Sequence, residues 1–162
     1  MAELVTSRRE NALAAIFAFI HHFAAFTLFA ALVVELVLLR HELTVQIART
    51  IQRFDLIYGI AAGVLLVAGF LRVLYFEKGE HYYFNSIPFH IKLGAFIVVG
   101  LLSIVPTMEF FSWSKVLKAG QAPVLDATRV RKLRILIHME LTGVGVIIVC
   151  AALMAKGIGY HG

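Results

Sequence analysis

Two adjacent histidines, His21 and His22, lie inside a long apolar segment and are the residues of this sequence best suited to chemistry. The segment runs from residue 12 to residue 39 without proline or glycine, long enough to cross a bilayer as a helix. Ionisable side chains are costly inside a membrane, so they usually face the interior of a helix bundle. Imidazole is a common metal and haem ligand, and it carries protons near neutral pH. The pair therefore predicts a cofactor or a proton path.

Polar and aromatic residues also gather around the start of a third apolar segment. His90 and Lys92 lie near its first turn, and Arg72, Tyr82 and Tyr83 precede it. Together they could form a polar cap that holds haem propionates or an anionic, quinone-like substrate. Lys92, Tyr82 and Tyr83 are thus candidate catalytic residues, although the Lys92 amine could equally extend to the membrane interface.

Acidic residues lie near the opposite ends of the apolar segments. They are Glu35, Asp55, Glu109 and Glu140, and His138 is close to the last of them. This group could deliver protons from that side, with Glu140 and Glu35 as the carriers. Alternatively, it pairs with interface arginines, namely Arg40, Arg53 and Arg134.

A haem in a helical bundle is commonly held by histidines of facing helices. A rise of about 1.5 Å per residue puts His21 and His22 roughly 13–15 Å from the end of their span, near the bilayer midplane. His90 is shallower and His138 is deeper, so either one could be the second iron ligand only if the helices tilt or slide. One histidine with lysine, water or an open position is the alternative. The sequence contains no His-Glu-x-x-His and no paired-cysteine motif.

The composition indicates which elements must position these side chains. Of the 162 residues, 60% are hydrophobic and 15% are charged, and the mean hydropathy is +0.87. Soluble domains average about 45–50% apolar and about 25% charged residues. We therefore expect an integral membrane protein whose net charge of +5 comes from basic connections and does not indicate nucleic-acid binding.

Four apolar segments predict an all-α, integral membrane four-helix bundle that forms a single transmembrane domain over residues 1–162. The predicted spans are about 12–39, 56–75, 88–108 and 135–155. Pro106 is expected to end or kink the third helix. Close helix packing is predicted at Gly59, Gly63, Gly143 and Gly145, because small residues let membrane helices approach.

Helical spacing separates the two histidines. His21 shares a stripe with small and aliphatic residues (Ala14, Ala18, Ala25 and Leu28), which predicts that it faces the bundle. His22 lies about 100° round the helix, on the side of Phe19, Phe26 and Phe29.

The distribution of basic residues predicts the orientation in the membrane. Nine lysines and arginines lie on the side of the first and third connections, and six lie on the side of both termini. Because basic residues favour the cytoplasmic side, both termini are expected in the periplasm and the chain in the bacterial inner membrane. Arg8-Arg9 resembles an export signal, but the apolar run that follows is too long for a cleavable one, so we expect a retained helix.

The chain resembles a bacterial family of predicted four-span membrane proteins of unknown function. The resemblance covers nearly the whole chain and rests on four motifs: His21-His22-Phe-Ala-Ala-Phe, Phe76-Glu77-Lys78-Gly79 with Tyr82-Tyr83, Lys92-Leu93-Gly94 and Met154-Ala155-Lys156-Gly157.

More distantly, the chain is similar to the haem-containing, four-span protoporphyrinogen oxidases of bacteria. The matching positions are His21 or His22, Lys92-Leu93, and Arg134 with Glu140. That similarity implies one b-type haem held by the first-span histidine, with Lys92 near the haem or the substrate. The doubled histidine and His138 before the glutamate depart from that family's pattern.

These observations predict a membrane protein that binds one or two b-type haems and acts in electron transfer, or as an oxidoreductase on a quinone- or porphyrin-like substrate. The iron ligands would come from His21, His22, His90 and His138, with Arg72 near the propionates. The expected surroundings are the lipid bilayer and a redox partner or a second copy of the chain. Two alternatives stay open: a small proton- or ion-coupled transporter or channel, and a haem-free accessory subunit.

Overall fold

A computed structural model describes residues 2–71 and 86–159 of the chain. Its long helices are α1 (Ala2–Leu38), α2 (Val45–Leu71), α4 (Ile87–Ser112) and α6 (Ala127–Ala155), and the short α5 (Ser114–Lys118) follows α4. Within the described residues, four segments are long and apolar enough to cross a membrane: Ala12–Leu38, Val45–Leu71, Ile87–Lys118 and Ala127–Ala155. The predicted all-α four-helix membrane bundle is confirmed.

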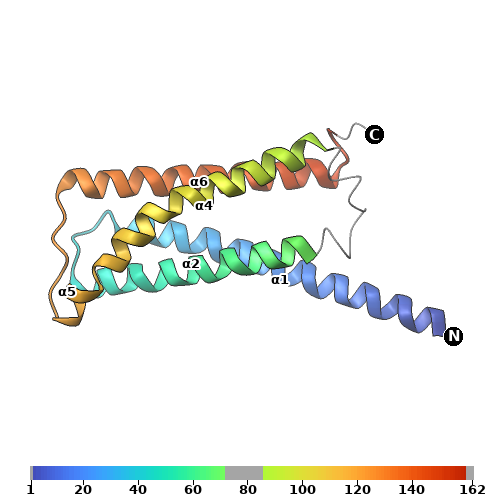
Figure 1. Cartoon of the computed structure of the whole chain (residues 1–162), viewed down its shortest axis with the longest axis horizontal. Coiled ribbons are helices and arrows are strands. Elements are labelled where there is room, and N and C mark those ends of the chain that lie inside the picture. The colour runs from blue at the N-terminus through green and yellow to red at the C-terminus, as the bar shows by residue number, and fades with distance from the viewer. Residues whose placement is uncertain (1, 72–85, 160–162) are drawn as a thin grey trace.

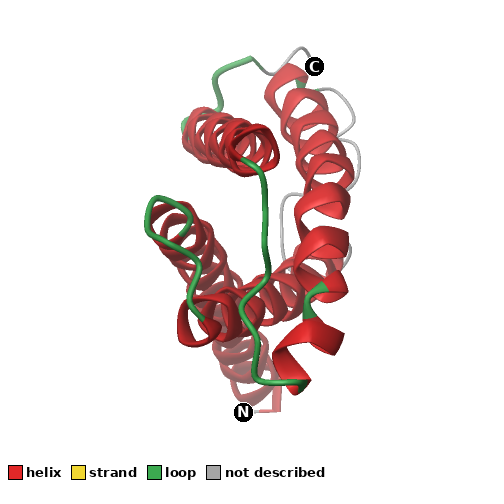
Figure 2. Ribbon diagram, turned by 90° about the vertical axis from the view of Figure 1, so that its left-hand side faces the viewer, coloured by secondary structure: helices red, strands yellow, loops and turns green. Residues whose placement is uncertain are grey.

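The helices form two antiparallel pairs (Figure 1). The most extensive contacts are those of α1 with α2 and of α4 with α6, while α1–α6 and α2–α4 contacts join the pairs. Residues 39–44 and residues 113–126 make the two turns at one end of the bundle, which we call the connection end. α1 begins and α6 ends at the opposite end, which we call the terminus end. Figure 2 shows the connection end facing the viewer, with its loops in front of the helices.

Most of the packed core lies toward the connection end. Buried side chains of all four long helices belong to it, among them Leu32, Ile51, Phe110 and Ile137. Trp113 between α4 and α5 closes this part of the core, with its ring centroid 5.0 Å from that of Phe110.

α2 begins at Val45, well before the span predicted from residue 56. Its polar first turns contact the end of α4 and α5. Gln52 Nε2 donates to the Phe110 carbonyl at 2.6 Å, and Arg49 Nη2 donates to the Leu117 carbonyl at 3.0 Å. These bonds add a side-chain donor to carbonyl groups at helix ends, each of which also accepts a backbone N–H from the turn that follows.

Two other helix boundaries also differ from the apolar spans. α6 begins at Ala127 because Asp126 caps it, its carboxylate accepting from the Arg129 backbone N–H at 2.7 Å. Pro106 lies inside α4 and does not end the helix. Tyr75, the predicted end of the second span, lies outside the described residues.

Close helix packing occurs at one of the four predicted glycines. A Cβ atom at Gly143 of α6 would overlap Cγ2 of Val99 in α4. Around Gly59, Gly63 and Gly145, such an atom would meet nothing within 4 Å. The predicted close contacts are therefore wrong at these three positions, because no atom of another helix comes near enough to touch a side chain there.

Candidate functional site

Two carboxyl groups are buried inside the bundle, one from each helix pair. Glu35 of α1 is 2% exposed and Glu140 of α6 is 1% exposed, and they are the buried charged residues of the described chain. Asp55 of α2 is half-buried and interacts electrostatically with both of them. The structure thus brings together three of the four acidic residues that the sequence placed on one side of the membrane.

Hydroxyl side chains of α2 and α4 join these carboxyl groups. Buried Tyr58 has its hydroxyl close to the side chains of Glu140 and Ser103. Thr107 Oγ1 donates to Asp55 Oδ1 at 2.7 Å. We use the name polar cluster for Glu35, Asp55, Tyr58 and Glu140.

The buried carboxyl groups lack partners for part of their hydrogen-bonding capacity. Oε1 of Glu35 and Oε1 of Glu140 are buried and make no hydrogen bond with the described chain. No ion pair between described residues involves the cluster or the arginines considered as its alternative partners, namely Arg40, Arg53 and Arg134. A buried carboxyl group without a cationic partner is most stable in its neutral, protonated form. The cluster therefore has the chemistry of a proton-binding site.

Two further residues predicted for this group have other partners. Glu109 Oε1 accepts from Trp113 Nε1 at 3.2 Å. His138 is exposed, and its Nδ1 donates to the Arg134 carbonyl at 2.7 Å. Within the described ranges, no group of three or more His, Cys, Asp or Glu side chains is close enough to hold a metal ion.

The adjacent histidines have different surroundings, as the stripe of small residues predicts. His21 is half-buried, and its Cε1 lies 3.7 Å from where a Cβ atom would stand at Gly69 of α2. His22 is exposed, and its Nδ1 donates to the Ala18 carbonyl at 2.6 Å. That bond places the ring proton on Nδ1 and leaves the Nε2 lone pair for a ligand.

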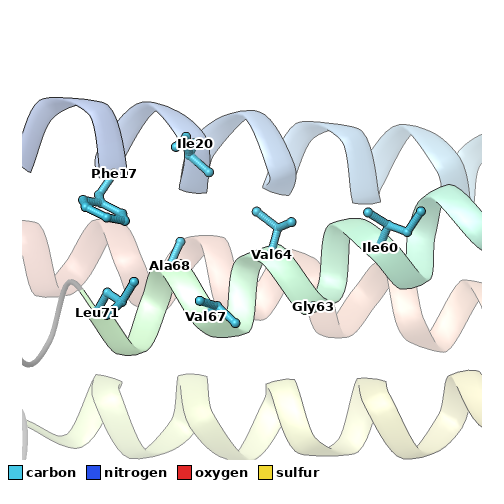
Figure 3. A pocket seen from close by; sticks show the side chains of 8 residues that line it. All are labelled: Phe17, Ile20, Ile60, Gly63, Val64, Val67, Ala68 and Leu71. Atoms are coloured by element: carbon cyan, nitrogen blue, oxygen red, sulfur yellow. The ribbon is translucent and has the colours of Figure 1, made fainter. Parts of the chain in front are cut away.

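An apolar hollow of about 420 Å³ lies between α1 and α2, close to His21 along the chain (Figure 3). Phe17 and Ile20 of α1 line one side, and residues of α2 between Ile60 and Leu71 line the other. All of its lining residues are apolar or glycine, so their side chains offer a bound molecule apolar contacts and no hydrogen bonds.

The predicted polar cap at the terminus end is partly described. Lys92 is half-buried, and His90 is exposed with its Nδ1 donating to the Ser86 carbonyl at 3.0 Å. Arg72, Tyr82 and Tyr83 lie outside the described residues. Their part in a cap stays a prediction.

Residues 13–159 match the model of a protein family described as predicted membrane protein (DUF2214). The chain belongs to this family. The match includes every residue of the polar cluster and the histidine pair. No curated protein and no solved structure matches this DUF2214 chain. Its membrane class is thereby established, while the distant similarity to protoporphyrinogen oxidases and the orientation of the termini stay predictions.

Sequence reasoning missed the hydroxyl groups that accompany the carboxyl groups. Tyr58 follows Asp55 by three residues, and Thr107 follows Ser103 by four, so each pair lies on one helix face. Polar residues spaced by one helical turn inside an apolar span were the signal available for this DUF2214 sequence.

Proposed function

We propose that this DUF2214 protein binds and transfers protons within the membrane at its polar cluster. The observation that carries the proposal is the burial of Glu35 and Glu140 with one oxygen of each carboxyl group lacking a hydrogen bond to the described chain. Ionisable residues inside a spanning bundle are costly and commonly mark proton or ion pathways. Two such residues from different helices, which would repel each other and Asp55 if all three were ionised, fit that role better than a packing role.

The chemistry of the cluster supports proton transfer between helices. The Tyr58 hydroxyl can both donate and accept a hydrogen bond and lies close to Glu140, so it can accept a proton from that carboxyl group while donating its own. Neighbouring ionised carboxyl groups repel one another, so the cluster would release and rebind its protons one at a time.

Proton movement into sealed vesicles tests the proposal. Purified protein is reconstituted with a pH-sensitive dye inside, and a potassium gradient with valinomycin imposes a membrane potential. We expect the wild-type protein to acidify or alkalinise the lumen faster than empty vesicles, and Glu35→Gln and Glu140→Gln to abolish the difference. Glu42→Gln, which removes an exposed carboxyl group of the connection end, is the matched control and should behave like wild type. Wild-type vesicles no faster than empty ones would refute the proposal.

Haem binding at the histidine pair is a second candidate function, favoured by the hydrogen bond that orients His22 and by the position of His21 against α2. A histidine whose Nδ1–H is held by a carbonyl group presents Nε2 to a metal, the usual arrangement of a ligating imidazole. Either residue could hold a b-type haem, which when bound supplies one-electron chemistry. The apolar surroundings of the pair would exclude water and admit a lipophilic, quinone- or porphyrin-like substrate.

An absorption spectrum of the detergent-purified protein tests this second candidate. A Soret band that disappears in His21→Ala or His22→Ala, and persists in His41→Ala at the exposed connection end, is the expected result. A colourless preparation with its full helical content would exclude it.

A further inference from the structure

Asp55 differs from the two buried glutamates of the polar cluster in its access to the surroundings. Its side chain is half-buried, whereas those of Glu35 and Glu140 are buried. Arg53 is exposed and precedes Asp55 by two residues, about 3 Å along the helix axis. Because an arginine on a spanning helix directs its charge to the polar interface, Asp55 lies close to the interface at the connection end.

Asp55 is also joined to α4 at the edge of the cluster. Thr107, whose side chain is exposed, donates to Asp55 Oδ1 at 2.7 Å. One turn earlier in α4, Ser103 lies close to the Tyr58 hydroxyl. These two links connect α2 with α4, a helix pair that otherwise makes few contacts. A proton that enters from this side therefore reaches the hydrogen-bonded Thr107 and Asp55 before it reaches the buried carboxyl groups.

The groups that face Asp55 come from every long helix. They are Thr107 of α4, Glu35 of α1 and Glu140 of α6, with Tyr58 one turn away on α2 itself. Among described residues, no lysine or arginine forms an ion pair with it. The Thr107 hydroxyl holds one carboxyl oxygen, which leaves Oδ2 to exchange a proton with water at the interface.

We propose that Asp55, oriented by Thr107, is the exchange point through which protons pass between the connection-end interface and the buried Glu35–Glu140 pair. The proposal rests on the proton-binding function of the polar cluster. In this proposal Asp55 determines how fast protons exchange, and the two glutamates determine how many protons are held. Thr107 is a positioning residue, because it acts through Asp55.

A pH jump on purified protein in detergent micelles separates rate from amount. A water-soluble pH dye, followed in a stopped-flow instrument, reports how fast protons bind and how many bind per chain. We expect Asp55→Asn to slow binding about tenfold or more, in line with the effect of removing a positioned proton-transfer group. The amount should fall by no more than the proton of the removed carboxyl group. Asp55→Glu, which keeps a carboxyl group, should restore most of the rate, and Thr107→Val should slow binding less than Asp55→Asn does.

The outcomes distinguish this proposal from the function on which it rests. An Asp55→Asn protein that binds protons at the wild-type rate would overturn the exchange role while leaving the glutamate site intact. Loss of proton binding beyond the removed carboxyl group would place Asp55 in the storage site and would also overturn it. If Glu35→Gln and Glu140→Gln bind as many protons as the wild-type protein, the proton site itself is refuted. If Asp55→Asn loses its helical circular dichroism, Asp55→Glu decides the question. Slow proton binding by Asp55→Glu would overturn the exchange role of a carboxyl group at this position, and fast binding would support that role.

Discussion

Gly143 provides a quantitative test of the α4–α6 contact that positions Glu140. An alanine Cβ at this position would overlap Cγ2 of Val99, which is buried. Glycine to alanine in a helix interior gains about 1 kcal/mol from helix propensity, and overpacking a core contact costs about 1–3 kcal/mol. At Gly145, two residues further along the same helix, the same change meets open space and keeps its gain. We therefore expect Gly143→Ala to be less stable than Gly145→Ala by about 1–3 kcal/mol.

Thermal unfolding in detergent micelles, followed by helical circular dichroism, measures this difference. For a chain of this size, 1 kcal/mol corresponds to a shift of about 2–4 °C in Tm, so the two variants should differ by roughly 2–12 °C. Val99→Ala removes the overlapping methyl group and should recover part of the loss when combined with Gly143→Ala, although it creates a cavity of its own. Equal Tm values for Gly143→Ala and Gly145→Ala would refute the close approach of the two helices.

Three further substitutions test other parts of the bundle. Asp126→Ala removes the cap of α6 and should lower the free energy of unfolding by about 0.5–2 kcal/mol, whereas Asp126→Asn, which caps equally well, should not change it. Gln52→Ala removes one of the two donors to the buried Phe110 carbonyl, which keeps the Trp113 backbone N–H at 3.3 Å, and should cost about 0.5–1.5 kcal/mol in the same unfolding assay. Glu35→Met replaces a buried carboxyl group with an apolar side chain of similar length and should leave Tm unchanged or raise it while removing proton uptake. A large fall in Tm for Glu35→Met would instead assign the carboxyl group a structural role.

Hydropathy predicts the four long helices because burying about 20 apolar residues in lipid dominates the energy of each span. It does not predict where α2 and α6 begin. Both helices begin before their apolar spans because a side chain caps the first turn: Thr44 Oγ1 accepts from the Ile47 backbone N–H of α2, and Asp126 accepts from the Arg129 backbone N–H of α6. Such hydrogen bonds do not appear in a hydropathy profile, and the bond from Gln52 to the end of α4 also depends on a residue far away in the sequence.

The sequence predicts which types of residue form the candidate site, but it predicts less well which individual residues belong to it. Glu35 and Glu140 are conspicuous as carboxyl groups near or within apolar spans, and both enter the polar cluster. Glu109 looks equivalent in the sequence but bonds to Trp113 instead. The difference is one of helical phase, since the face of α4 that carries Thr107 meets Asp55. A single sequence does not specify how its helices rotate against one another, because that rotation is set by tertiary contacts such as the one between Val99 and Gly143.

The polar cluster and the histidine pair stand at different levels of the bundle, and this separation shapes what their functions could share. Glu35 follows His21 by 14 residues on α1, about 21 Å along the helix axis. That distance exceeds any hydrogen bond, so a proton could not pass directly between the two sites. A haem at the histidines and protons at the carboxyl groups would therefore be independent in their first steps. His21→Ala should then leave proton binding by the cluster unchanged even if it removes a haem spectrum. Joint loss of both, in a protein of wild-type stability, would mean that the two ends of the bundle are coupled through the helices themselves.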